Sequence, residues 1–519
     1  MKRTEPRLLR GRHFSILVSA IAALVAWNIS PVQGIAQSPG KNKASLTRSL
    51  NAQQKRAWKV TGKKLRKVLK QRRLRRSKVG MVVINPRGQI LFAHNASKAL
   101  IPASTTKLFT IATALEVLGP HYRFETKVYS TAKISPAGVL QGNLYIKGSG
   151  DPRLRSEEMW RIARDLYNMG LRRIKGRVVF DDSVFDRKRW IPGLKDHLHQ
   201  RYRPYLAPVG GFAVNYSCLA IALRPGRKAG QPARVTLDPP TRYVRKIINR
   251  TTTVEKGWRM RIKFKLRKRG GRDILIIRGR VPRRAQPRTY WRRISNPGWY
   301  AAFVFAHFLR KQRIRVSRWP RRGKVPTSAR TLYTHRSPYL SALLQFAGKY
   351  SSNFSTEMVL KTLGAQQVSE PGTWSKGLSV VQKWMKKRNI LKGRFRMING
   401  SGLGRRNRFT PLQMVRLLQV MNRNFATRSD FFVAQPTAGR DGTLQRRFKG
   451  TDVAGRMRAK TGTIDGVSTL AGYVKTKGGQ MLLFFMGMNG SKRKTGLFRR
   501  VQETLGQILV RHQRRPNQR

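Results

Sequence analysis

The sequence predicts an α+β fold in which one antiparallel sheet, flanked by helices, is interrupted by a mainly β insertion. Three observations support this class. Apolar strand-like runs occur near both ends of the ordered chain, amphipathic helical patterns follow them, and the long middle consists of short strand-like segments between turns. Because the first and last strands lie far apart in the sequence, we expect both ends of the chain to share one sheet.

The first elements form a hairpin followed by a helix. Val79–Ile84 is an apolar strand, the Pro- and Gly-containing segment 85–88 is a turn, and Gln89–Ala93 returns as the second strand. A helix is expected over 104–118, where Gly119-Pro120 ends it. Its apolar face carries Leu108, Ile111, Ala112 and Leu115.

The middle and the end of the chain complete this pattern. The inserted material is predicted to contain the strands Leu144–Lys147, Val178–Phe180, Leu219–Leu223 and Ile274–Arg278. Helices are expected at 300–309, 339–347 and 354–363, with Gly364 as the C-cap of the last one. Strands then follow at 457–463, 469–474 and 481–488. A final amphipathic helix places Leu497, Phe498, Val501, Leu505, Ile508 and Leu509 on one side.

The charge of the chain is extreme, with 110 Lys and Arg against 21 Asp and Glu and a formal net charge of +89. Such a charge indicates a polyanionic partner: nucleic acid, anionic lipid or an envelope polymer. A basic N-terminus, an apolar run from Phe14 to Trp27 and the small residues Gly34-Ile35-Ala36 predict a secretory signal. We therefore expect a periplasmic or other extracytoplasmic location, with membrane association possible, and no nucleic-acid partner.

Residues 37–78 are predicted to form a basic linker and helix. Thirteen of the 24 positions from Lys55 to Lys78 are Lys or Arg, and Leu65, Val68, Leu69 and Leu74 form an apolar stripe. This stripe either lies on an anionic surface or packs on the folded body. Cys218 is the single cysteine, which excludes an intrachain disulfide and Cys-rich zinc sites.

Three short motifs carry the chemistry. Ser104-Thr105-Thr106-Lys107 opens the first long helix, Ser351-Ser352-Asn353 precedes another, and Lys460-Thr461-Gly462-Thr463 lies on a predicted strand. Residues i and i+3 share a helix face, so the amine of Lys107 can reach the hydroxyl of Ser104. A lysine whose pKa is depressed by burial can activate a serine nucleophile.

The other two motifs complete a site for acyl transfer. Ser351 is suited to relay a proton to a leaving amine, and the amide of Asn353 can bond a substrate carbonyl and a lysine. Lys460, Thr461 and Thr463 would lie on a strand edge, where an extended peptide with a free carboxylate can pair. The motifs together predict a serine acyltransferase that acts on peptides.

At these motifs the sequence resembles the penicillin-binding protein and serine β-lactamase superfamily. Within it, the likeness is to the D-alanyl-D-alanine carboxypeptidase/endopeptidase family of the DacB type (peptidase S13). The long interval between Ser104 and Ser351 fits a family that inserts extra domains after the nucleophile helix. Further similar segments are 102–107, 147–152, 337–340, 400–403 and 407–411, spread with the motifs over about 78–510.

The resemblance implies a β-lactamase/transpeptidase-like domain and assigns the roles in its site. Ser104 would be the nucleophile, Lys107 its base and Ser351 the proton relay. Asn353 would bind the substrate amide, and Lys460 with Thr461 and Thr463 the terminal carboxylate. The backbone N–H groups of Ser104 and Thr463 would form the oxyanion hole. The family usually has an acid where this chain has Ser352, which we expect to change the local charge without abolishing activity.

The implied substrates are peptidoglycan stem peptides ending in D-Ala-D-Ala, and cross-links between stems, cleaved through an acyl-Ser104 intermediate without a cofactor. β-Lactam antibiotics would acylate the same serine, and basic segments could contact an anionic envelope surface. The expected organisation is a signal peptide (1–36), the basic linker/helix (37–78), a penicillin-binding domain (79–126 and 335–512) and an insertion (127–334) of two nested subdomains.

Two other functions stay open. Class A β-lactamases place a glutamate beyond the middle motif, and this chain has no acid between Glu370 and Asp430, which favours a penicillin target over a class A enzyme. Hydrolytic β-lactamases of other classes stay open. The other alternative is a degenerate enzyme scaffold that binds polyanions.

Three further features of the sequence are weaker signals. Asp196-His197-Leu198-His199 lacks a metal-site frame, so no metal is expected. Gly148-Ser149-Gly150 is expected to be a turn capped by Asp151. Glu357 either orients the middle motif or is a surface acid.

Overall fold

The computed structural model describes residues 50–193, 202–255 and 259–513. The predicted signal segment and the Asp196–His199 cluster lie outside these ranges. None of the helices within the described ranges is both long and apolar enough to cross a bilayer.

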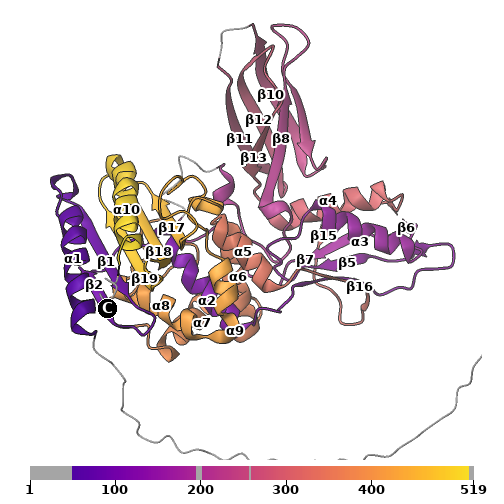
Figure 1. Cartoon of the computed structure of the whole chain (residues 1–519). Coiled ribbons are helices and arrows are strands. Elements are labelled where there is room, and N and C mark those ends of the chain that lie inside the picture. The colour runs from indigo at the N-terminus through magenta and orange to yellow at the C-terminus, as the bar shows by residue number, and fades with distance from the viewer. Residues whose placement is uncertain (1–49, 194–201, 256–258, 514–519) are drawn as a thin grey trace, which may run out of the picture. The chain divides into compact units, whose positions relative to one another are not determined.

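The two ends of the described chain share one five-stranded antiparallel sheet, as predicted. Its order is β17–β18–β19–β1–β2, and β1 pairs with β19 from Lys78↔Asn489 to Ile84↔Leu483. Figure 1 shows the early strands, in indigo, beside the late ones, in yellow. The strands are β1 (Lys78–Ile84), β2 (Ile90–His94), β17 (Met457–Ile464), β18 (Val467–Lys475) and β19 (Met481–Asn489).

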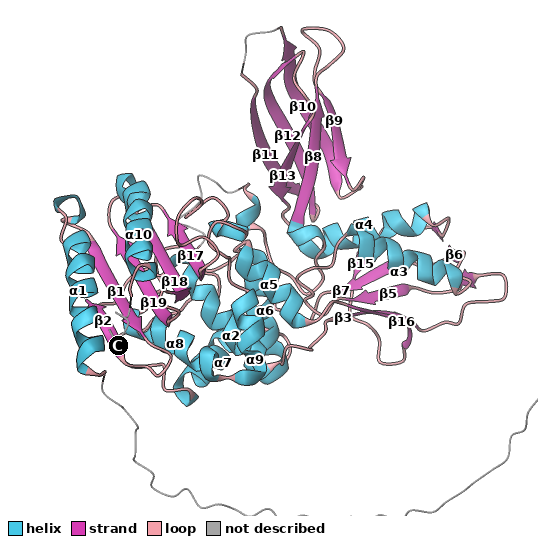
Figure 2. Cartoon of the chain, in the orientation of Figure 1, coloured by secondary structure: helices cyan, strands magenta, loops and turns pink. Residues whose placement is uncertain are grey.

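Helices cover both faces of this sheet, so its central strands are apolar on both sides (Figure 2). On β1, Met81 and Val83 enter one core, and Val82 and Ile84 enter the other. The first core is closed by α1 (Ala52–Leu69) and α10 (Thr495–Val510). The second is closed by α2 (Lys107–Val117), α5 (Leu340–Lys349), α6 (Asn353–Gln367), α7 (Trp374–Lys387), α8 (Pro411–Arg423) and α9 (Phe425–Val433).

Helix α1 packs on the folded body, which decides between the two alternatives for the basic segment. Its stripe of Trp58, Leu65, Val68 and Leu69 is buried in the same core as α10. The lysines and arginines therefore occupy the outer side of the helix. The helix begins at a capping box between Asn51 and Gln54.

The prediction that Gly364 ends α6 is wrong. The helix continues to Gln367, and Val368 follows as the C-cap. Gly364 instead lies against α7, where an added Cβ would come within 2.7 Å of the Gly377 nitrogen. An added Cβ on Gly377 would in turn lie 2.0 Å from the Leu360 carbonyl oxygen. These two glycines therefore allow α6 and α7 to approach closely.

We expect Gly377→Ala to destabilise the protein by about 1–3 kcal/mol, because the new methyl group overlaps the backbone of α6. The measurement is urea unfolding. Gly496→Ala is the matched control: it is also helical, and its nearest neighbour would be 3.8 Å away. The control should be neutral or stabilising by up to about 1 kcal/mol, since alanine is the better helix former. Equal stability of the two variants would contradict this packing.

The insertion is mainly β with two helices, α3 (Ser156–Asn168) and α4 (Pro297–Lys311). One five-stranded sheet has the order β15–β7–β5–β3–β16 and packs on both helices. Its strands are β3 (Glu125–Ser130), β5 (Leu144–Lys147), β7 (Val178–Asp181), β15 (Arg321–Arg322) and β16 (Arg330–Arg336). A small adjacent sheet contains β4 (Val139–Leu140), β6 (Arg173–Ile174) and β14 (Arg315–Val316).

Two three-stranded sheets lie within this insertion in sequence, between β7 and α4. Their orders are β10–β12–β11 and β13–β8–β9. The strands are β8 (Cys218–Arg224), β9 (Arg234–Asp238), β10 (Val244–Val254), β11 (Arg261–Arg269), β12 (Arg272–Pro282) and β13 (Arg288–Arg293). All four strands predicted for the insertion are present, and three of them are longer than predicted. Helices α3, α7, α8 and α9 were not predicted.

Candidate active site

The first motif lies at the start of α2. A 3₁₀ turn over Ala103–Thr106 leads into this helix, and Ala103 adopts a left-handed φ of 46° that is costly for a non-glycine residue. The turn holds Ser104 partly exposed and Lys107 fully buried. The Lys107 amine lies 3.0 Å from Ser104 Oγ. The predicted contact between the Ser104 hydroxyl and the Lys107 amine is therefore present.

The Lys107 amine bonds to neutral oxygen atoms and not to a carboxylate. Its Nζ donates to Asn353 Oδ1 at 2.7 Å and to the Ser401 carbonyl at 2.6 Å, besides contacting Ser104. Burial lowers the pKa of Lys107 to about 7, and the charge of Glu357 opposes this shift. Near neutral pH much of this lysine is therefore the free amine, which can accept a proton.

The second motif lies at the N-terminus of α6. Ser351 has a left-handed φ of 59°, and Ser352 caps the helix by accepting a hydrogen bond from the Ser355 nitrogen at 3.1 Å. Ser352 thus serves as the N-cap, a position that serine and acidic residues both fill well. Asn353 contacts Lys107 through its oxygen and donates through Nδ2 to the Tyr205 carbonyl at 3.0 Å.

The third motif lies on β17, next to the second. Lys460 is fully buried and donates to Ser351 Oγ at 2.9 Å. Burial, with a smaller contribution from the charge of Lys107, holds the pKa of Lys460 well below its usual value. Thr461 donates to Thr443 Oγ1 at 2.7 Å, and the Thr463 side chain is exposed. An arriving carboxylate would favour the charged form of Lys460.

Glycine 462 allows β17 to pass close to the nucleophile. A Cβ at this position would lie 2.6 Å from the Pro102 carbonyl oxygen and 3.0 Å from the Ser104 nitrogen. Only a residue without a side chain fits that spacing. The strand therefore brings the neighbouring Thr463 towards the backbone of Ser104, where an oxyanion hole requires two N–H groups.

Glu357 orients the site and is not a surface acid. It is fully buried, and its two oxygens accept hydrogen bonds from the Ser401 nitrogen at 2.7 Å, the Gly400 nitrogen at 3.1 Å and Trp374 Nε1 at 2.8 Å. It thereby fixes the loop whose Ser401 carbonyl accepts from Lys107. The carboxylate positions the base without touching the nucleophile.

We expect Glu357→Gln to slow acylation about tenfold, because an amide cannot accept from all three donors. Loss of the charge should also lower the pKa of Lys107 further, so the pH midpoint of acylation should move to lower pH. The measurement is the rate of penicillin acylation against pH.

Glu503→Gln is the matched control for this change. Glu503 lies on α10 and accepts from Arg447 Nε at 2.9 Å. This variant removes the ion pair with Arg447 but should keep the acylation midpoint. An unshifted midpoint in Glu357→Gln would contradict its positioning role.

Hydrogen bonds join five of the seven predicted site side chains into two groups. Lys107 joins Ser104 and Asn353, and Lys460 joins Ser351. Thr461 lies beside Lys460 on β17, and Thr463 lies further along the same strand. No group of three or more His, Cys, Asp or Glu side chains in the described residues is arranged to hold a metal ion.

Sequence reasoning missed the carbonyl groups that complete the site, those of Ser401 and Tyr205, and the hydroxyl of Thr443. A backbone carbonyl carries no residue-type signal, so only the glycines around Ser401 could have pointed to it. The turn expected at Gly148-Ser149-Gly150 lies instead at Pro152-Arg153, where Asp151 Oδ1 accepts from the Arg153 nitrogen at 2.8 Å.

Comparisons with known proteins agree in sequence and in fold. The model of the D-Ala-D-Ala carboxypeptidase 3 (S13) family matches residues 61–508. A D-alanyl-D-alanine carboxypeptidase of Actinomadura sp. (strain R39) is 30% identical over 506 residues, 94% of this chain and 91% of the relative. The crystal structure of penicillin binding protein 4 (dacB) from Haemophilus influenzae has a TM-score of 0.73 at 23% identity, covering 86% of this chain and 99% of its own. A structure of that protein complexed with a β-lactam has a TM-score of 0.69, again at 23% identity, covering 85% and 97%.

Proposed function

Because the chain belongs to the D-Ala-D-Ala carboxypeptidase 3 (S13) family, as its motifs predicted, we propose that it hydrolyses peptidoglycan stem peptides through an acyl-Ser104 intermediate. The observation that carries this proposal is the position of the Lys107 amine, 3.0 Å from Ser104 Oγ, with a pKa of about 7. The reactions are removal of a terminal D-alanine and cleavage of the cross-link between stems.

Acylation begins when Ser104 Oγ attacks the carbonyl between the two D-alanines and its proton passes to the neutral amine of Lys107. The backbone N–H groups of Ser104 and Thr463 stabilise the oxyanion. The C–N bond then breaks, and Ser351, hydrogen-bonded to Lys460, relays a proton to the leaving amine. Lys460, Thr461 and Thr463 hold the terminal carboxylate. Water then attacks the acyl-enzyme and frees Ser104.

Asn353 binds the substrate through its side-chain amide, whose oxygen and nitrogen both already have hydrogen-bond partners in the protein. Its oxygen accepts from Lys107 and its nitrogen donates to the Tyr205 carbonyl. A substrate carbonyl would share or replace the second of these bonds. The residue thus links the base, the insertion and the substrate.

The test of this function is incubation of the purified protein with a stem pentapeptide ending in D-Ala-D-Ala and with a cross-linked dimer. Release of D-alanine, or of the separated stems, is expected. Absence of both products, with covalent penicillin labelling intact, would contradict the peptidase assignment.

The β-lactamase alternative requires a carboxylate that is available to activate water at the acyl-enzyme. Glu357 lies on α6 shortly after Asn353. It is not available for this role, because its oxygens already accept three hydrogen bonds. A penicilloyl enzyme should therefore persist. Drug turnover on the order of 1 per second or faster would favour a β-lactamase.

We also propose that residues 1–36 direct export and that basic segments hold the enzyme at an anionic envelope surface. The support is the net charge of +89 and the outward basic side of α1, whose apolar stripe is buried. Binding of this kind is sensitive to salt. Sedimentation with envelope fractions that persists in high salt would contradict it. We further propose that the chain is divided into a penicillin-binding domain (79–126 and 335–512) and a nested insertion (127–334).

A further inference from the structure

The sheet of the insertion has one face that α3 and α4 do not cover. Leu144, Ile146, Val178 and Phe180 point into the core with those helices. The alternating positions point the other way, and register places Tyr145 opposite Val179, and Val179 opposite Arg321. These three side chains therefore form a row on the outer face. Arg322 alternates with Arg321 and points inward.

A hollow of about 360 Å³ lies on this outer face. Its cationic lining is Arg177, Arg318, Arg321, Lys324 and Arg322, the last of which is paired with Asp182, and Asn143 and Tyr145 are neutral hydrogen-bonding groups. No acidic side chain among the described residues lines it. Three of the cations, Arg318, Arg321 and Lys324, belong to one exposed segment.

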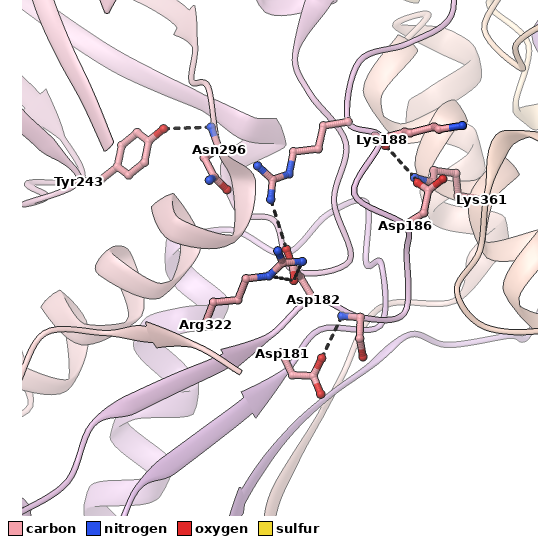
Figure 3. Close-up of polar contacts among 10 residues, drawn as sticks. Asp181, Asp182, Asp186, Lys188, Tyr243, Asn296, Arg322 and Lys361 are labelled. Carbon is pink, nitrogen blue, oxygen red and sulfur yellow. Dashed lines mark hydrogen bonds and ion pairs between the residues drawn. The ribbon is translucent and has the colours of Figure 1, made fainter. Parts of the chain in front are cut away.

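Two buried aspartates at the end of β7 fix that segment from behind. Asp182 lies 2.7 Å from the Arg322 guanidinium and also faces Arg189 at 3.9 Å. Asp181 accepts hydrogen bonds from the Val325 nitrogen at 3.0 Å and the Ser183 nitrogen at 2.9 Å. Figure 3 shows Arg322 directed at Asp182. The aspartates thus neutralise the inward arginine and leave the outward cations to the hollow.

The opposite side of the hollow is also held in place. Asn143 accepts from the Arg177 nitrogen at 2.8 Å and donates to the Tyr145 hydroxyl at 3.3 Å. The Arg177 guanidinium donates to the Trp319 carbonyl at 3.3 Å. The cations around the hollow are therefore carried by backbone that hydrogen bonds already fix. This lowers the entropy cost of ordering the site when an anion binds.

We infer that this hollow binds the phosphate groups of an anionic envelope polymer. A phosphodiester carries its charge on two free oxygens that match an arginine fork, and a polymer repeats this group, so cations held along one segment can engage adjacent groups. A polymer fits better than a bilayer surface because the site is concave. The proposed envelope location is needed only to say where the polymer comes from.

The test compares two triple variants of the full chain that remove the same charge. Arg318→Gln/Arg321→Gln/Lys324→Gln empties the hollow of its exposed cations. Arg261→Gln/Lys263→Gln/Lys265→Gln removes three exposed cations from β11. Calorimetry with poly(glycerol phosphate) at about 0.15 M salt should show affinity lowered about tenfold or more in the first variant and less than about twofold in the second. Equal losses would overturn the inference, because they would indicate only general attraction to the net charge.

Three further probes decide the chemistry and the source. Competition by inorganic phosphate at concentrations where chloride has no effect supports recognition of the phosphate group. Equal binding of a carboxylate polymer such as polygalacturonate, lost equally in the first variant, would overturn it. Binding to anionic phospholipid vesicles but not to the polymer would overturn the choice of a polymer. Penicillin labelling of Ser104 should be unchanged in both variants, which separates failure of this inference from failure of the peptidase proposal.

Discussion

Replacing Ser104 by alanine is expected to abolish covalent labelling by penicillin and to lower peptide hydrolysis on the order of 10⁶-fold. The change removes the atom that forms the acyl bond, and no neighbouring group can replace it: Lys107 and Ser351 are each held by hydrogen bonds within the site. The measurement is gel fluorescence of a labelled penicillin, with intact mass to locate the adduct.

The variant should stay folded, because Ser104 is partly exposed and its hydroxyl contacts the Lys107 amine within the site. Ser379→Ala is the matched control, since Ser379 lies on α7 and donates only to the backbone of its own helix. It should label like the unchanged protein. An adduct that persists in Ser104→Ala would show that another residue is the nucleophile.

The central sheet could be predicted because its inner strands β1 and β19 are largely apolar runs that need cover on both faces. Val79–Ile84 and Met481–Met488 read clearly as strands and pair as neighbours. Helices α7 and α8 were not predicted, although both are clearly amphipathic. The signal for α8 was present, in Thr410, Pro411 and Gln413, which form a capping box with proline at the start of the helix.

Gly364 shows why a local rule failed. Glycine is common just beyond helix ends, and the sequence alone cannot show that a second helix, not yet predicted, crosses at that position. The close approach of Gly364 to Gly377 is a tertiary contact, and it overrides the local preference. Recognising α7 first would have turned the same glycine into a packing signal.

The candidate site could be predicted where its chemistry lies in side chains at fixed spacing. Ser104 and Lys107 share a helical turn, so their contact follows from the sequence. The contact between Lys107 and Asn353 joins segments far apart in the chain and needed the family likeness. The role of Glu357 was left open because burial, which decides it, is not visible in one acidic residue on a helix.

Removing the base gives the second large effect. Lys107→Gln should slow acylation by penicillin on the order of 10³-fold, because glutamine can keep hydrogen bonds to the site but cannot take the serine proton. Stopped-flow acylation rates measure the loss. Lys383→Gln on the exposed side of α7 is the matched control and should react at the unchanged rate.

The pH dependence distinguishes a lost base from a disturbed site. Burial brings the pKa of Lys107 to about 7, so the amine is mainly protonated below that pH and mainly neutral above it. Because the neutral amine is the base, acylation in the unchanged protein should rise as the pH increases through about 7 and level off above it. Lys107→Gln has no group that titrates there, so its residual rate should show no such rise. A rate that falls over this range in the unchanged protein, or a rise that survives in the variant, would show that Lys107 is not the base.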